Sequence, residues 1–302
     1  MGIIDESHVV VQPLHNEWYD GKVAAIDMLR LDLVHPVVSG NKWYKLRLNM
    51  KHAVESGFKN IVTFGGGYSN HLIATAFTAK MFGLRSVGIV RGKYPVLTPT
   101  LVACKEQGME LIFVSQEDYN NNPDSYRGEW AEKLVAHFDE IFIIPEGGAN
   151  EWGRAGAGLI DRFVDHGYTQ VAVSVGTGTT FIGLRNKIGL QQQLLGFVPM
   201  KQGTYLNGYI KEHIVAGADA NWQLFDAWHF GGFGKWDNEL IRFMNDFYRI
   251  NHIPLDIVYT SKMMYGVRQM LDRYFFTKED RVLCIHTGGL QGNTSVQSML
   301  TF

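Results

Sequence analysis

Residues Asn60 to Phe82, NIVTFGGGYSNHLIATAFTAKMF, carry the clearest indication of the fold. Asn60–Phe64 is a short, mostly apolar run that is typical of a buried strand. Three glycines follow, and from Ser69 to Phe82 the apolar residues recur at helical spacing until Gly83 stops the helix. The segment therefore predicts a strand, a glycine-rich turn and a helix.

The same alternation continues on both sides of this segment. Further strands are expected at Arg85–Val90, Glu110–Val114, Ile141–Ile144, Val171–Val175, Leu194–Val198, Gln223–Ala227, Asp256–Val258 and Val282–Ile285. Helices are expected at Tyr44–Val54, Leu97–Gln107, Asp124–Phe138, near Glu151–His166, after Thr179, and at Asn238–Arg249 and Lys262–Tyr274. Strands that alternate with helices form right-handed crossover units. The pattern predicts an α/β protein with open, mostly parallel sheets and helices on both faces.

Composition narrows the functional classes. The chain has 302 residues, 46% of them hydrophobic, and a net charge of −2, so it is globular and has no basic stripe for nucleic acid or anionic membranes. Its two cysteines, Cys104 and Cys284, are too few for a disulfide framework and are expected to be buried bystanders. The histidines show no metal-ligand spacing, so no metal is expected. Without a leader-like start or a long apolar run, a cytoplasmic protein is expected.

The glycines, 33 in number, fall at the ends of the apolar runs rather than in a linker. Ligands of open α/β sheets bind beyond the carboxyl ends of the strands, so the residues that follow each strand are the candidates. They are Gly65–His71, Gly176–Thr180 (GTGTT), Tyr259–Lys262 and His286–Gly289, with Ser39–Lys42 beside them. The GTGTT segment suits a phosphate, because its glycines and hydroxyls present donors at a helix start. The alternative is an ordinary glycine-rich turn capped by threonine.

The other candidates also have structural interpretations. Ser69 and Asn70 are preferred helix N-caps, and Lys42 in isolation is typical of a solvated surface lysine. His71 has no acidic neighbour in sequence that would orient it as a base. These residues gain significance only in combination.

Six motifs occur in order and at suitable spacing: Ser39–Lys42 (SGNK) with Lys45-Leu46, Gly66–His71 (GGYSNH), Pro145–Gly148 (PEGG), Ser174–Thr180 (SVGTGTT), Val258–Thr260 (VYT) and His286–Gly289 (HTGG). In these motifs the chain resembles the family of 1-aminocyclopropane-1-carboxylate deaminases and D-cysteine desulfhydrases, pyridoxal-phosphate enzymes of the tryptophan-synthase-β fold type. The resemblance spans about Leu29 to Leu290. It implies two α/β domains with the cofactor between them: a smaller inserted domain at 44–154, and a larger cofactor-binding domain at 1–43 and 155–302. By analogy with the family, we expect a homodimer.

The resemblance also implies roles for individual residues. Lys42 matches the lysine that holds the cofactor aldehyde and shuttles the α-proton, and Ser69 matches the catalytic hydroxyl that meets the substrate carboxylate or moves protons. The cofactor phosphate would lie against Gly176, Thr177, Gly178, Thr179 and Thr180. Asn70 matches the residue at the 3′-oxygen, Tyr259 the aromatic group packed on the pyridine ring, and Thr287 the residue facing the ring nitrogen.

Several residues depart from the family pattern and bear on the substrate. Deaminases that open the cyclopropane ring show Ser-Asn-Gln and Tyr-Glu, where this chain has His71 after Ser69-Asn70 and Thr260 after Tyr259. Phe233 stands where relatives carry a substrate-side tyrosine, and Tyr68 stands in place of a glutamine. Either change is consistent with a relative that acts on another small amino acid. Alternatively, the Tyr68 hydroxyl replaces the tyrosine hydroxyl that Phe233 lacks. Phe233 equally suits ordinary core or pocket packing.

Together the implied substrate-side residues are Ser69, Asn70, His71, Tyr68 and Phe233. We therefore expect a lyase that eliminates the β-substituent of a small D-amino acid, with D-cysteine giving pyruvate, sulfide and ammonia as the lead case. The alternatives are deamination of 1-aminocyclopropane-1-carboxylate, racemisation or dehydration of a D-hydroxyamino acid, and a cofactor-binding protein without turnover.

Overall fold

The computed structural model describes residues 4–121 and 129–302. The chain forms two compact units. The first consists mainly of Lys42–Gly156, and the second mainly of Asp5–His35 and Ala157–Phe302.

The first unit is built on a four-stranded parallel sheet in the order β5-β4-β3-β6. These strands are β3 (Asn60–Gly66), β4 (Arg85–Arg91), β5 (Met109–Val114) and β6 (Ile141–Ile144). Its helices are α2 (Asn41–Glu55), α3 (Asn70–Met81), α4 (Pro99–Glu106), α5 (Gln116–Asn121), α6 (Glu129–Leu134) and α7 (Glu151–Gly158). Separate apolar clusters pack α3 and α4 on one face and α5 and α6 on the other. Because both faces are covered, the strands are nearly continuous apolar runs.

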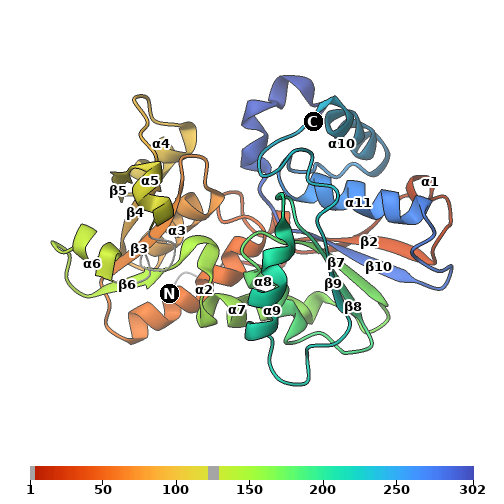
Figure 1. Cartoon of the computed structure of the whole chain (residues 1–302), viewed down its shortest axis with the longest axis horizontal. Coiled ribbons are helices and arrows are strands. Elements are labelled where there is room, and N and C mark those ends of the chain that lie inside the picture. The colour runs from red at the N-terminus through yellow and green to blue at the C-terminus, as the bar shows by residue number, and fades with distance from the viewer. Residues whose placement is uncertain (1–3, 122–128) are drawn as a thin grey trace. The chain divides into compact units, whose positions relative to one another are not determined.

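The second unit contains a six-stranded sheet in the order β1-β2-β10-β7-β8-β9. Its strands are β1 (Val11–Pro13), β2 (Ala25–Arg30), β7 (Gln170–Ser174), β8 (Gln193–Phe197), β9 (Trp222–Phe225) and β10 (Arg281–His286). Its helices are α1 (Asn16–Tyr19), α8 (Thr179–Arg185), α9 (Leu206–His213), α10 (Asn238–Asn251) and α11 (Thr260–Asp272). Figure 1 shows α10 and α11 on one face of this sheet and α8 and α9 on the other. The main core cluster lies under α10 and α11.

The expected fold class is confirmed, with differences at particular elements. The edge strand β1 pairs antiparallel with β2, and neither strand was predicted, nor were α1, α5 and α9. The strand expected at Asp256–Val258 is wrong, because this segment is an irregular turn into α11. The helix expected at Asp124–Phe138 lies partly outside the described residues, and its described part ends at Leu134.

Helix α2 begins at Asn41 rather than at Tyr44, so Lys42 lies in its first turn and not in a loop. Gly40, with φ +65°, makes the turn that precedes it. Within residues 4–121 and 129–302, no helix is long and apolar enough to span a membrane.

Candidate active site

In the second unit, Asn41 ties together three of the motifs. Its side-chain amide donates to Thr180 Oγ1 at 2.9 Å, and its backbone N–H donates to the carbonyl of Thr287 at 3.2 Å. Gly40 makes this approach possible, since a Cβ there would lie 1.9 Å from the Thr287 oxygen. The segments that follow β7 and β10 are therefore held together at the carboxyl edge of the sheet, and Lys42 is the next residue of the chain.

The GTGTT segment forms the turn at the start of α8. Gly178 adopts φ +81°, which favours glycine, and Thr179 begins α8. The hydroxyls of Thr177 and Thr179 bond to each other at 2.9 Å. Among the described residues, no acceptor bonds to the backbone N–H groups of Gly178, Thr179 and Thr180. Such a set of unpaired donors at a helix start attracts an anion.

Tyr259 covers one side of this turn. Its Cε1 lies 3.4 Å from the position of a Cβ at Gly176, so the ring packs directly on the glycine backbone. Phe233 meets the Tyr259 ring edge to face, with centroids 5.9 Å apart, and is itself 54% exposed. In the second unit, Tyr259 therefore packs on Gly176, and Phe233 packs on Tyr259 with its own ring partly exposed to solvent.

Thr287 is buried, directly after β10. Its position is fixed by His286, whose Nδ1 accepts from the Gly288 N–H at 3.1 Å while Nε2 donates to the Pro254 carbonyl at 2.8 Å. These bonds set the turn that carries Thr287.

The first unit gathers Lys42, Lys45 and His71. Lys45 lies one helical turn after Lys42 and is 6% exposed, and its ammonium has no acceptor in the part of the chain that the structure describes. His71 lies on α3, and the Lys45 Cβ and His71 Cε1 flank the same glycine, Gly148, within 4 Å of where a Cβ would stand.

Burial and neighbouring positive charge lower the pKa of both Lys45 and His71. Burial, followed by the charge of Lys42, holds the pKa of Lys45 well below its usual range. Burial, followed by the charges of Lys45 and Lys42, does the same to the pKa of His71, so its ring is neutral. The Thr63 hydroxyl donates to the Ile144 carbonyl and lies 2.9 Å from Nε2 of His71, and the Pro145 backbone acts on the pKa of this ring in the opposite direction.

The turn before α3 presents Ser69 and Asn70. Ser69 caps the helix by accepting from the Leu72 N–H, which leaves its own O–H able to donate. Asn70 is half-buried, and no described residue bonds to its amide. The Tyr68 side chain, by contrast, is 72% exposed and makes no hydrogen bond or ring contact with a described residue.

Two residues that the sequence analysis missed hold this turn in place. The Tyr94 hydroxyl accepts from the Gly67 N–H at 2.9 Å, and the Thr98 hydroxyl donates to the Gly67 carbonyl. The Tyr94 ring occupies the space of a Gly67 side chain. No pattern in the sequence indicates these contacts. The position of Lys45 near Lys42, by contrast, follows from their spacing of three residues on a helix.

No family model matches the chain. It is 29% identical to a protein of Thermotoga maritima named "Putative 1-aminocyclopropane-1-carboxylate deaminase", over 87% of this chain and 88% of that protein. A protein of the same name from Pyrococcus horikoshii is 28% identical over 89% and 86%. These matches confirm the resemblance carried by the six motifs.

Solved structures agree. The crystal structure of a homologue of 1-aminocyclopropane-1-carboxylate deaminase superposes with a TM-score of 0.82 at 25% identity, covering 99% of this chain and 95% of that one. An O-acetylserine-dependent cystathionine β-synthase from Helicobacter pylori has a TM-score of 0.69 at 16% identity, covering 98% of each chain, and shows the fold alone. The fold is thus tryptophan-synthase-β-like, fold type II.

Proposed function

We propose that this chain is a pyridoxal-phosphate-dependent lyase that eliminates the β-substituent of a small D-amino acid, with D-cysteine as the lead substrate. The observation that carries the proposal is the bonding of Asn41. It joins Thr180 of the GTGTT turn to Thr287, and the residue after it is Lys42. Lys42 thus directly follows the residue that bonds to the anion-binding turn. A cofactor with both an aldehyde and a phosphate requires a lysine and an anion site.

The residues of the GTGTT turn fit the phosphate. The unpaired N–H groups of Gly178, Thr179 and Thr180 and the hydroxyls beside them would donate to its oxygens. Lys45, which is 6% exposed and whose side chain bonds to no described residue, also suits an anionic group of the cofactor or substrate.

When bound, pyridoxal phosphate supplies an electron-withdrawing ring that takes up the electron pair left on the α-carbon. Lys42 would remove the α-proton with its Nζ. Ser69 would donate its hydroxyl proton to the substrate carboxylate at the start of α3, where the helix dipole favours negative charge. Tyr259, packed on Gly176, would fix the plane of the ring. Thr287 would face the ring nitrogen with a neutral hydroxyl.

The Thr260 side chain favours elimination over ring opening. Its hydroxyl donates to the carboxylate of Asp256 and accepts from the Asp256 N–H, so it offers neither charge nor a proton to a substrate. Phe233 has no hydroxyl either. Elimination of a good leaving group needs only removal of the α-proton. The names of the relatives support the second candidate, deamination of 1-aminocyclopropane-1-carboxylate.

One experiment separates the candidates. Purified protein is reconstituted with pyridoxal phosphate and given D-cysteine, L-cysteine, D-serine, β-chloro-D-alanine and 1-aminocyclopropane-1-carboxylate, with keto acid as the readout. Pyruvate from D-cysteine and β-chloro-D-alanine supports the proposal, and 2-oxobutanoate from the cyclopropane favours the second candidate. Keto acid from none of them, with the visible band of the bound cofactor present, favours a binding protein without turnover.

Lys42→Ala tests the cofactor assignment directly. We expect this variant to lose the visible band and all turnover, because an alanine side chain has no amine that could hold the cofactor aldehyde. A visible band that persists unchanged in this variant would show that Lys42 does not hold the cofactor. The domain limits at 44–154, the homodimer and the cytoplasmic location stay predictions.

A further inference from the structure

The segment Trp228–Lys235, which we call the aromatic loop, has a backbone that needs support. It follows β9 and reads WHFGGFGK. Phe230 (φ +50°), Gly231 (+88°), Gly232 (+124°) and Gly234 (+67°) all lie in the left-handed region. The three glycines adopt this region readily, but Phe230 costs energy there and persists only when the surroundings hold it.

The support is the ammonium of Lys262. Its Nζ donates to the carbonyls of His229 and Gly232, each at 2.9 Å, and the residue is 2% exposed. The same two carbonyls accept the N–H groups of Gly232 and Lys235, which close the loop's own turns. Lys262 therefore bonds to the same two carbonyl oxygens that accept the internal hydrogen bonds of the aromatic loop.

The rest of the loop follows one face of α11. Tyr259, Lys262 and Gly266 are spaced three and four residues apart, so they share a face of the helix. Phe233 packs on Tyr259, and Trp228 lies 2.7 Å from the position of a Cβ at Gly266. Next to this face, Phe230 meets Tyr265 edge to face at 4.9 Å. The loop is docked along the helix that begins beside Tyr259, with Lys262 at the centre.

We propose that Lys262 is a positioning residue that docks the aromatic loop on α11, so that Phe233 forms an apolar edge beside Tyr259 and selects substrates by their β-substituent. This rests on the proposed function, in which Tyr259 packs against the cofactor. A thiol, thioether or halide loses little when it is desolvated against a phenyl ring. A hydroxyl or carboxylate loses its water and finds no partner there. The aromatic loop thus favours amino acids with a soft, weakly hydrated leaving group over hydroxy and acidic ones.

The charge state of Lys262 agrees with this role. Burial lowers its pKa to about 8, and the carboxylate of Asp256 acts in the opposite direction. At neutral pH the side chain is an ammonium, and its bonds to carbonyls are charge-assisted, about twice as strong as neutral ones.

Cleavage of the unliganded protein tests the docking without any turnover. Chymotrypsin cuts after Phe230 and Phe233 only when the aromatic loop opens. We expect Lys262→Met, which removes both bonds, to raise the cleavage rate there by about tenfold or more, since the loss of even one charge-assisted bond corresponds to about tenfold. Lys262→Arg, which keeps the charge and two donors, should restore most of the protection.

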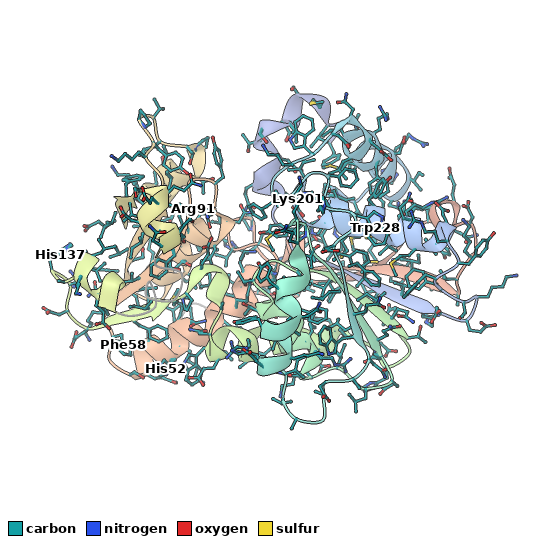
Figure 2. All side chains as sticks on the ribbon, in the orientation of Figure 1. His52, Phe58, Arg91, His137, Lys201 and Trp228 are labelled. Carbon is teal, nitrogen blue, oxygen red and sulfur yellow. The ribbon has the colours of Figure 1, made fainter. Side chains whose placement is uncertain are left out.

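Lys201 supplies the matched control. It lies beside the same loop (Figure 2), with Cγ 3.7 Å from the position of a Cβ at Gly232, but it is exposed and bonds to no described residue. Lys201→Met should leave the cleavage rate unchanged. Equal rates in Lys262→Met and the parent protein overturn the positioning role.

The selectivity is tested on the holoenzyme by the ratio of kcat/KM for D-cysteine to that for D-serine. Phe233→Tyr leaves the loop docked and supplies a hydroxyl, so the ratio should fall about tenfold, the effect of one pocket hydrogen bond. Lys262→Met should lower the ratio mainly by raising KM for D-cysteine. An unchanged ratio in Phe233→Tyr overturns the selectivity. If the parent protein turns over none of the substrates, the proposed function and the selectivity fail, while the cleavage rates still decide whether Lys262 docks the loop.

Discussion

Gly40 is the residue on which the assembly of the candidate site depends most directly. Its φ is +65°, and a Cβ would stand 1.9 Å from the Thr287 oxygen and 2.5 Å from the Gly288 nitrogen. We expect Gly40→Ala to lower the free energy of unfolding by about 3 kcal/mol or more, because backbone strain and a backbone clash add. Urea unfolding measures the change.

Gly57 provides the control for that substitution. Its φ of +80° is equally left-handed, but nothing lies within 4 Å of its Cβ position. Gly57→Ala should cost only the conformational strain, about 1–2 kcal/mol. If both variants lose the same free energy, the close approach of Gly40 to Thr287 contributes nothing.

Two polar residues show why strand β2 could not be predicted from the local sequence pattern. Asp27 and Arg30 interrupt the apolar run of Ala25–Arg30, and that is why β2 was not predicted. In the structure, Asp27 accepts from the Tyr168 hydroxyl at 2.6 Å, and Arg30 forms a two-point ion pair with Asp32. Both polar side chains are buried because they have partners, and Tyr168 is 141 residues away in the chain.

At the scale of elements, the start of α11 replaces the strand that was expected at Asp256–Val258. The Asp256 carboxylate uses both oxygens. Oδ1 accepts from the N–H groups of Val258 and Tyr259, and Oδ2 from the N–H and hydroxyl of Thr260. These bonds fold the segment into a cap, which in turn orients Tyr259.

Asp256→Asn tests this cap. An asparagine retains one acceptor oxygen, so the bonds to Thr260 are lost, and we expect the free energy of unfolding to fall by about 2 kcal/mol. Asp237 caps α10 through Oδ1 alone, accepting from the N–H groups of Glu239 and Leu240. Asp237→Asn should therefore change stability by less than about 0.5 kcal/mol, since Asn and Asp are comparable caps. Equal effects of the two substitutions in urea unfolding would show that Oδ2 of Asp256 is not needed.

At the scale of the whole molecule, His71 makes stability depend on acid pH. Burial, Lys45 and Lys42 keep its folded-state pKa well below the ordinary value, so the folded protein does not take up this proton. The unfolded chain does so as the pH falls below about 6.5. Stability is therefore complete above that pH and is lost below it, by about 1.4 kcal/mol per pH unit from this one group.

The measurement is urea unfolding of the cofactor-free protein between pH 7 and pH 5. His71→Gln removes the titrating ring, and its stability should decline less steeply over this range. His35, whose pKa burial also lowers, contributes in the same direction and remains in both proteins. Parallel curves for the two proteins would mean that His71 accepts a proton in the folded state.

The sequence by itself determined the α/β class, the parallel strands and the turns that carry the candidate residues. These depend on local patterns: apolar runs that end in glycine, and helices whose apolar spacing begins after a capping residue. The resemblance carried by the six motifs also agrees with the relatives of this chain. Only the tertiary structure decided that Asn41 bonds Thr180 and Thr287, that Lys45 is buried, and that Lys262 holds the aromatic loop. In each case the polar group's partner is distant in the chain or its charge is unpaired, and burial or pairing of a polar group is a property of the packed fold rather than of its neighbours in sequence.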